Sequence, residues 1–211
     1  MRYKFYREHK FVSAALNDVE RIAAKIDFRS PEETKRLSLE LERLISMLKG
    51  HAAYENDKLH GLLKGKNSEI LAQIEKDHEE QELDFKHLKK LLDKAIQAKS
   101  EEEQVEGGYQ FYLYYRKFVA DNLAHLYQEE TTILPELQQL YTDEELKKVE
   151  AKTYHEMTID QLVGMMEVLF PHMNTHDRKA FLQDVKDAEP DKYKLALQNI
   201  GPSLDTKDIP V

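Results

Sequence analysis

The chain has 211 residues, a length that suits one domain or one domain with a helical addition. It is 41% apolar and 34% charged, with only 7 Gly and 6 Pro, which is typical of a helix-rich globular protein rather than a disordered or β-rich one. The net charge of −9 argues against a nucleic-acid or anionic-membrane surface, and no apolar run of about 18 residues is present. Because cysteine is absent, any metal must be held by His, Asp and Glu, and we expect a cytoplasmic location.

Four long amphipathic helices are predicted in the first two thirds of the chain. The first is expected over Tyr3–Ile26, and the second follows the cap Ser30 and ends near Gly61. The third is expected over Ser68–Ala98, and the fourth has its apolar stripe between Phe111 and Ile133. Short connections between long helices predict an all-α protein built on an up-down-up-down four-helix bundle.

Each predicted inward stripe contains one histidine. The four are His9, His51, His78 and His125. Glu55 and Glu129 follow the second and fourth of them by four residues, so imidazole and carboxylate project from one face of the helix. Because 40 of the 211 residues are acidic, this spacing is frequent by chance, and the position of each pair in the fold has to decide its meaning.

The predicted bundle brings these polar residues to one level. For each connecting turn, we count the residues back to the preceding histidine and forward to the next one. The two counts differ by one or two residues, or about 1.5–3 Å along a helix. Buried polar groups need partners, and nitrogen and oxygen ligands on facing helices are typical of a dinuclear transition-metal site. Iron suits these ligands best, and manganese or zinc stays open. The competing interpretation is a hydrogen-bonded core network without an ion.

The segments around these residues resemble the hemerythrin-like proteins of the HHE cation-binding group. They are REH around His9, HAAYE at 51–55, DHEE around His78 and HLYQEE at 125–130. The resemblance covers about residues 3–137. The segment MEVLFPHMNTHDRKAFLQDV at 166–185 is similar to the short-helix extension of many bacterial members.

The resemblance implies a centre with two iron ions and six ligand residues. It places His9 and His51 on one metal and His78 and His125 on the other, with Glu55 and Glu129 bridging the two. Bridging carboxylates offset metal charge, and an open coordination position accepts O₂, peroxide or water.

Two positions depart from the oxygen-carrying hemerythrins. Glu82 stands where the carriers have a second histidine, one turn after the third-helix histidine. Asn122 stands where they tend to have an apolar residue that lines the gas pocket. We therefore expect Glu82 to be an extra ligand or an acceptor that orients His78, and we do not expect simple reversible O₂ carriage.

Shorter helices are predicted after the bundle, with Thr142 and Asn174 as caps. The expected organisation is a bundle over residues 1–140, a helical extension packed on it over 141–200 and a tail over 201–211. His172 and His176 are separated by a helix break, so a surface or cap role is expected for them. The histidines that fall off the inward stripes are expected to be solvated: His60, His87 and His155.

The leading hypothesis is a non-haem di-iron protein whose centre meets O₂, peroxide or nitric oxide in an oxygen, iron or oxidative-stress response. One alternative is a di-iron enzyme that turns over peroxide or nitric oxide, with Glu82 or a nearby Tyr assisting proton transfer. Another is an iron-sensing regulatory module in which metal loading stabilises the fold. No nucleic-acid or membrane partner is expected, and the sequence indicates no particular protein partner.

Overall fold

The computed structural model describes residues 2–64 and 68–200, and every regular element in these ranges is helical. The predicted all-α fold, with a four-helix bundle and short C-terminal helices, is confirmed. The predicted tail, 201–211, lies outside the described residues. By their contacts, residues 12–133 form one compact unit, and the described residues before 12 group with those from 134 onward in a second unit.

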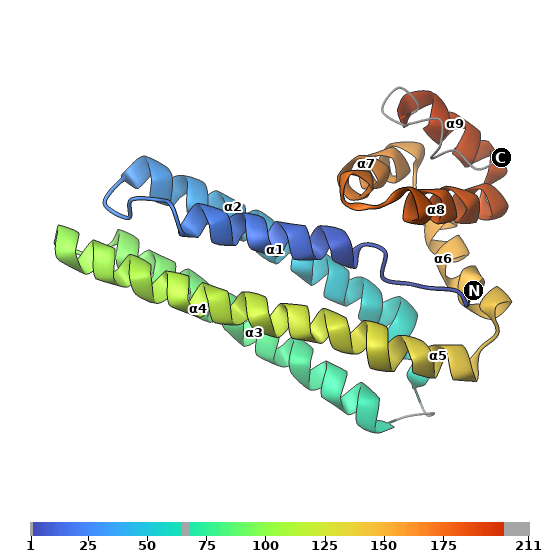
Figure 1. The fold of residues 1–211 in the computed structure, drawn as a ribbon, viewed down its shortest axis with the longest axis horizontal. Helices are drawn as coiled ribbons and strands as arrows, with labels where there is room; N and C mark the ends of the chain where they lie inside the picture. Colours follow the sequence, from blue (N-terminus) through green and yellow to red (C-terminus); the bar gives the residue numbers. More distant parts are fainter. Residues whose placement is uncertain (1, 65–67, 201–211) are drawn as a thin grey trace. The chain divides into compact units, whose positions relative to one another are not determined.

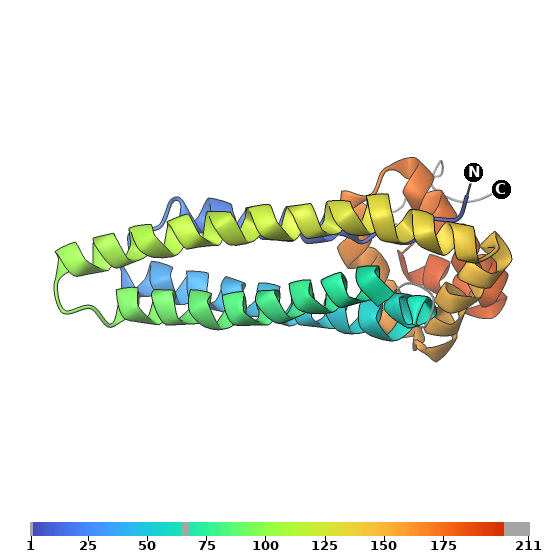
Figure 2. The same ribbon diagram turned by 90° about the horizontal axis from the view of Figure 1, so that it is seen from below.

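The first unit is the bundle. Its elements are α1 (His9–Ala23), α2 (Pro31–Tyr54), the π-helix η1 (Glu55–Leu59), the 3₁₀-helix η2 (His60–Leu63), α3 (Ser68–Ile96), α4 (Glu101–Gln128) and the π-helix η3 (Glu129–Ile133). Helices α1 to α4 run side by side, each antiparallel to the one before it (Figures 1 and 2). Ser30 caps α2, as predicted, and Ser100 forms a capping box with Glu103 at the start of α4.

The first helix begins later than its apolar pattern predicts. Helix α1 starts at His9 because Tyr6 has a φ of 67°, in the left-handed region that ends regular helix for a residue with a side chain. The residues before it bind the chain's C-terminal part instead. Arg2 Nε donates to Asp143 Oδ1 at 2.7 Å, and Gln138 Nε2 donates to the Tyr3 carbonyl oxygen at 2.7 Å.

The bundle core is apolar along most of its length. Leucines of α2 and α3 face an aromatic row on α4 formed by Phe111, Tyr115 and Phe118. The Tyr115 hydroxyl is fully buried with its ring and donates to the Leu16 carbonyl oxygen at 2.9 Å, which satisfies its hydrogen-bonding need. Tyr115 is therefore a packing residue that ties α4 to α1.

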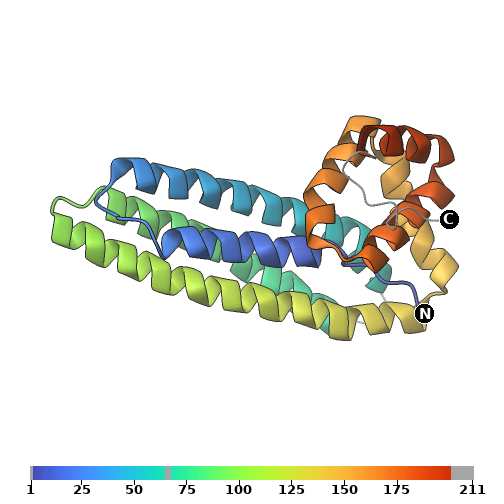
Figure 3. The same ribbon diagram turned by 45° about the horizontal axis from the view of Figure 1, so that its top comes forward.

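The second unit contains the short helices. They are α5 (Leu134–Leu140), α6 (Asp143–Glu156), α7 (Ile159–Leu169), the 3₁₀-helix η4 (Phe170–His172), α8 (Thr175–Ala188) and α9 (Pro190–Ile200). Helices α6 to α9 gather together at this end of the chain (Figure 3). In their apolar core Phe170 and Phe181 meet edge to face, with ring centroids 5.4 Å apart. Lys192 donates to three carbonyl oxygens at the end of α6, which compensates the negative end of that helix.

A polar cluster fixes the N-terminal segment within this second unit. The Arg7 guanidinium lies 2.8 Å from Asp184, and the Tyr3 hydroxyl donates to the same carboxylate at 3.2 Å. Tyr154 donates to Glu150 at 2.6 Å. Burial, with the nearby Glu8 carboxylate, raises the pKa of Glu150 to about 7.

None of the described helices is both long enough and apolar enough to cross a membrane.

Gly108 has no side chain, and this lets the Phe28 ring pack directly against α4. A methyl group at this position would come within 2.2 Å of the Phe28 ring, which lies in the turn between α1 and α2 and packs near Phe111. We predict that Gly108→Ala destabilises the protein by about 1–3 kcal/mol, because Phe28 has to leave its place in the core. Gly50→Ala is the matched control, since nothing lies within 4 Å of its added methyl group and alanine favours the helix. Thermal unfolding of both variants checks this, and equal stability would contradict the packing account.

Candidate metal centre

Four titratable side chains of the bundle converge on one point of its core. Glu55, His78, His125 and Glu129 each offer a nitrogen or oxygen atom, and these atoms all lie within 4.8 Å of one another. Both carboxylates are 0% exposed. His125 Nε2 lies 3.4 Å from Glu129 Oε1, and His78 Nε2 lies 3.9 Å from Glu55 Oε2. Two atoms that share a metal at about 2.0–2.2 Å from each are roughly 3–4 Å apart, so these spacings suit a bound ion.

The same two carboxylates also meet His51. Its Nε2 atom lies 3.2 Å from Glu55 Oε1, and one atom from each of His51, Glu55 and Glu129 fits within 4.8 Å. Glu55 and Glu129 therefore take part in two neighbouring ligand groups. That position is the one a carboxylate needs in order to bridge two ions.

His9 is the first residue of α1 and belongs with residues 1–11 by its contacts. Its side chain is 2% exposed, and its ring stacks on Tyr6 with centroids 4.6 Å apart. The left-handed backbone of Tyr6 thus presents an aromatic face to the imidazole just where the helix begins. Strained backbone of this kind is common beside functional residues.

The electrostatics of the bundle keep His78 neutral. Burial, together with the neighbouring His125 and His60 rings, lowers the pKa of His78 to about 4. At neutral pH its imidazole is therefore uncharged, which is the form that binds metals. Asp77 Oδ2 lies 3.6 Å from His125 Nδ1, on the side of that ring away from Glu129. A carboxylate in this position orients a metal-binding imidazole.

The donor set fits a first-row transition metal. The Nε2 atoms of His78 and His60 are buried and have no hydrogen-bond partner, although a buried polar atom ordinarily has one. Glu55 and Glu129 are also fully buried, and a buried carboxylate is stable only when it is paired or coordinates a metal. A bound cation would satisfy both requirements.

His60 is a buried residue beside Glu129 that the sequence pattern missed. It was expected to be solvated, and this is wrong, because its side chain is 2% exposed. Its Nε2 atom lies 3.6 Å from Glu129 Oε1, beside the group that contains His78 and His125 rather than within it. The π-helix explains the error, because its turn contains one extra residue. His60 therefore lies on the face of the helix where α-helical spacing would place Leu59. His87 and His155 are exposed, as predicted.

Glu82 and Asn122 occupy different surroundings from the ligand groups. Glu82 lies 2.9 Å from the Lys49 ammonium with its side chain 45% exposed, and it is in neither ligand group. Asn122 is buried; its amide donates to the Phe118 carbonyl oxygen at 2.8 Å and its Oδ1 accepts from Gln81 at 2.7 Å. Asn122 is therefore satisfied within the bundle. His172 and His176 are likewise in neither group.

Two cavities reach the ligand residues from outside the bundle. One, of about 700 Å³, is lined by His78, His60 and Asn56. The other, of about 520 Å³, is lined by His125. Four carboxylates and one ammonium also line this second cavity: Asp77, Glu80, Asp84, Asp121 and Lys117. Its acidic lining attracts cations toward the centre.

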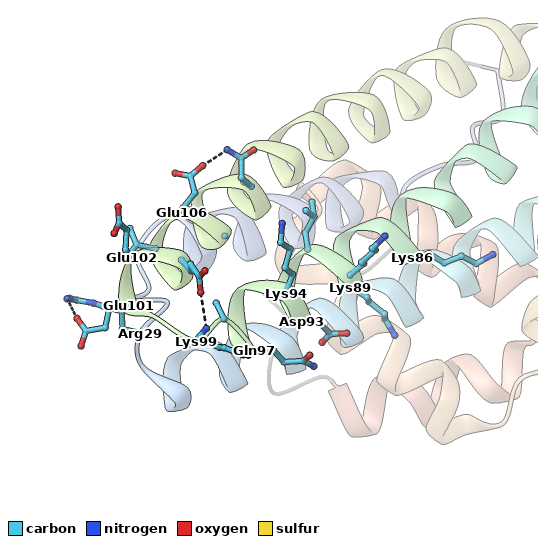
Figure 4. A pocket seen from close by; sticks show the side chains of 17 residues that line it. Arg29, Lys86, Lys89, Asp93, Lys94, Gln97, Lys99, Glu101, Glu102 and Glu106 are labelled. Carbon is cyan, nitrogen blue, oxygen red and sulfur yellow. Dashed lines mark hydrogen bonds and ion pairs between the residues drawn. The ribbon is translucent and has the colours of Figure 1, made fainter.

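A cleft of greater volume lies elsewhere, toward the turn between α3 and α4. It measures about 2080 Å³, and both lysines and glutamates line it, among them Lys89, Lys94, Glu102 and Glu106 (Figure 4). No histidine lines this cleft, and its charged groups are spread along two helices rather than gathered at one point. The chemistry of the bundle is therefore concentrated at the buried centre.

Comparison with known proteins agrees with this geometry. The family model described as the hemerythrin HHE cation binding domain matches residues 1–137. No curated protein and no solved structure matches the chain. The matched residues cover the four bundle helices and all the buried ligand groups described above. The chain belongs to the hemerythrin HHE cation-binding family.

Proposed function

We propose that the chain binds two iron ions and that this centre interacts with O₂, peroxide or nitric oxide in an oxygen, iron or oxidative-stress response. Membership of a cation-binding family supports metal binding. The observation that carries the proposal of two ions is that Glu55 and Glu129, both fully buried, each belong to two ligand groups. A single ion would be bound by one of these ligand groups, whereas carboxylates that bridge two ions belong to both groups.

The ligands divide between the two ions by helix. His78 and His125 hold one ion, and His51 holds the other together with His9. Support for His9 comes from its helix, because Val12, three residues later on the same face of α1, is fully buried in the bundle core. Glu55 and Glu129 bridge the two ions. Imidazoles and carboxylates are ligands that iron, manganese and zinc all accept, and the proposed oxidant chemistry selects iron.

The surrounding residues control what reaches the centre. Iron, when bound, supplies an open coordination position for a small oxidant or gas. The cavities at His78 and His125 give such a ligand access. Asp77 holds the His125 ring in place, and the buried aromatic row of α4 keeps water out of the core beyond it.

Metal loading tests the proposal. Protein loaded with ferrous iron without oxygen is expected to hold two irons per chain by elemental analysis. Admission of O₂ or peroxide is then expected to produce the absorption of an oxo-bridged diferric centre. One iron per chain would contradict the bridged centre, and a chain that stays metal-free after loading would overturn the proposal as a whole.

The two carboxylates are tested by nearly isosteric substitutions. We predict that Glu55→Gln and Glu129→Gln each lower the iron content below one per chain, because the amide brings no negative charge to the bridge. The metal-free variants are expected to be at least as stable as the metal-free protein, since an uncharged group is easier to bury. His87→Ala, at an exposed histidine outside the centre, is the control and is expected to keep two irons. Equal iron content in all three variants would refute the assignment.

A further inference from the structure

We propose that His60 is a seventh ligand residue of this centre and binds the ion held by His78 and His125. The proposal rests on the proposed function, since it adds a residue to the same site. Three observations carry it: the backbone turn that places the ring, the hydrogen bond that selects its protonated nitrogen and the surroundings of the other nitrogen.

The backbone brings His60 inward through a defined irregularity. The His60 N–H donates to the Glu55 carbonyl oxygen, a bond that spans five residues and defines a π turn. On an α-helix, a residue five positions on lies about 140° around the axis. The wider turn instead brings Glu55 and His60 onto one face, and both are buried. A π turn inserted in a helix is frequently a functional feature.

Asn56 selects which nitrogen of His60 carries the proton. Asn56 Oδ1 lies 3.1 Å from His60 Nδ1 and 3.2 Å from His78 Nδ1. An amide oxygen accepts and does not donate, so each ring donates to it from Nδ1, and the uncharged form of each ring carries its single proton there. One side chain thereby leaves a bare lone pair on the Nε2 atoms of both His60 and His78. Such a contact to the far nitrogen is the usual way of orienting a metal-binding imidazole.

The bare nitrogen of His60 points at a carboxylate. His60 Nε2 is buried, has no hydrogen-bond partner and lies 3.6 Å from Glu129 Oε1. With the proton on Nδ1, both of these atoms are acceptors, so their approach is unfavourable unless a cation lies between them. The distance is longer than a hydrogen bond and falls within the roughly 3–4 Å expected between two ligands of one ion.

The neighbouring rings show which ion His60 would bind. Its ring centroid lies 5.6 Å from that of His78, which in turn lies 5.1 Å from that of His125. Three imidazoles therefore surround Glu129 on this side of the centre. The ion here would have three nitrogen ligands besides the shared carboxylates, so the two ions would differ in coordination and in affinity.

Cobalt(II) is a suitable probe, because exchangeable ring N–H protons of bound imidazoles give separate, strongly shifted proton resonances. In cobalt-loaded protein, His60→Gln is expected to remove one such resonance and to weaken binding of one of the two cobalt ions by at least tenfold. His87→Gln is the matched control and is expected to change neither. An unchanged number of shifted resonances in His60→Gln, with both dissociation constants within twofold of the original, would overturn the role of His60.

The Asn56→Leu variant provides a second, independent test of the proposal. Loss of the acceptor is expected to weaken one cobalt site by about 10–100-fold while His60 is still present. This variant decides the matter if His60→Gln fails to fold. Because Asn56 contacts both rings, two shifted N–H resonances, those of His60 and His78, are expected to move, and movement of only one would count against the proposal. Failure of the proposed function gives a different result, because the unaltered protein would itself bind fewer than two cobalt ions.

Discussion

Burial of two carboxylates in the middle of a helical bundle is the constraint on which the rest of the structure depends. Glu55 and Glu129 are fully buried, and both lie beside the imidazoles of the two ligand groups. An ionised carboxylate in such a place is strongly unfavourable without a compensating charge. The core nevertheless supplies an imidazole that its own environment keeps uncharged, that of His78. The arrangement is one that a bound cation would stabilise.

Both carboxylates lie at the same kind of backbone irregularity. Glu55 is the first residue of the π-helix that follows α2, and Glu129 is the first residue of the π-helix that follows α4. A π turn changes which residues face the core after it, so ligand positions beyond each glutamate are set by the irregularity rather than by α-helical spacing. His60 owes its position to the first of these turns. The bundle thus contains an imidazole beside Glu129 that belongs to neither glutamate-histidine pair of the sequence.

Much of the fold and the centre follows from the sequence, and the parts that do not have local causes. Regular 3.6-residue spacing identified the four helices, and matched helix lengths placed His51, Glu55, His78, His125 and Glu129 in one layer of the bundle. The same rule failed for His60, because the extra residue of a π turn leaves no mark in the apolar pattern. It also failed at Tyr6, whose left-handed backbone delays the start of the first helix from the predicted Tyr3 to His9. Side-chain contacts between distant segments, such as Lys49 with Glu82, have no periodic signal either.

The central claim is that two ions lie on either side of a pair of buried carboxylates. Anomalous diffraction from crystals of the iron-loaded protein, measured at the iron absorption edge, tests it most directly. We expect two peaks about 3.5–4 Å apart, with Glu55 and Glu129 between them and His78 and His125 bound to the same peak. A single peak, or peaks at the exposed histidines instead, would contradict the account.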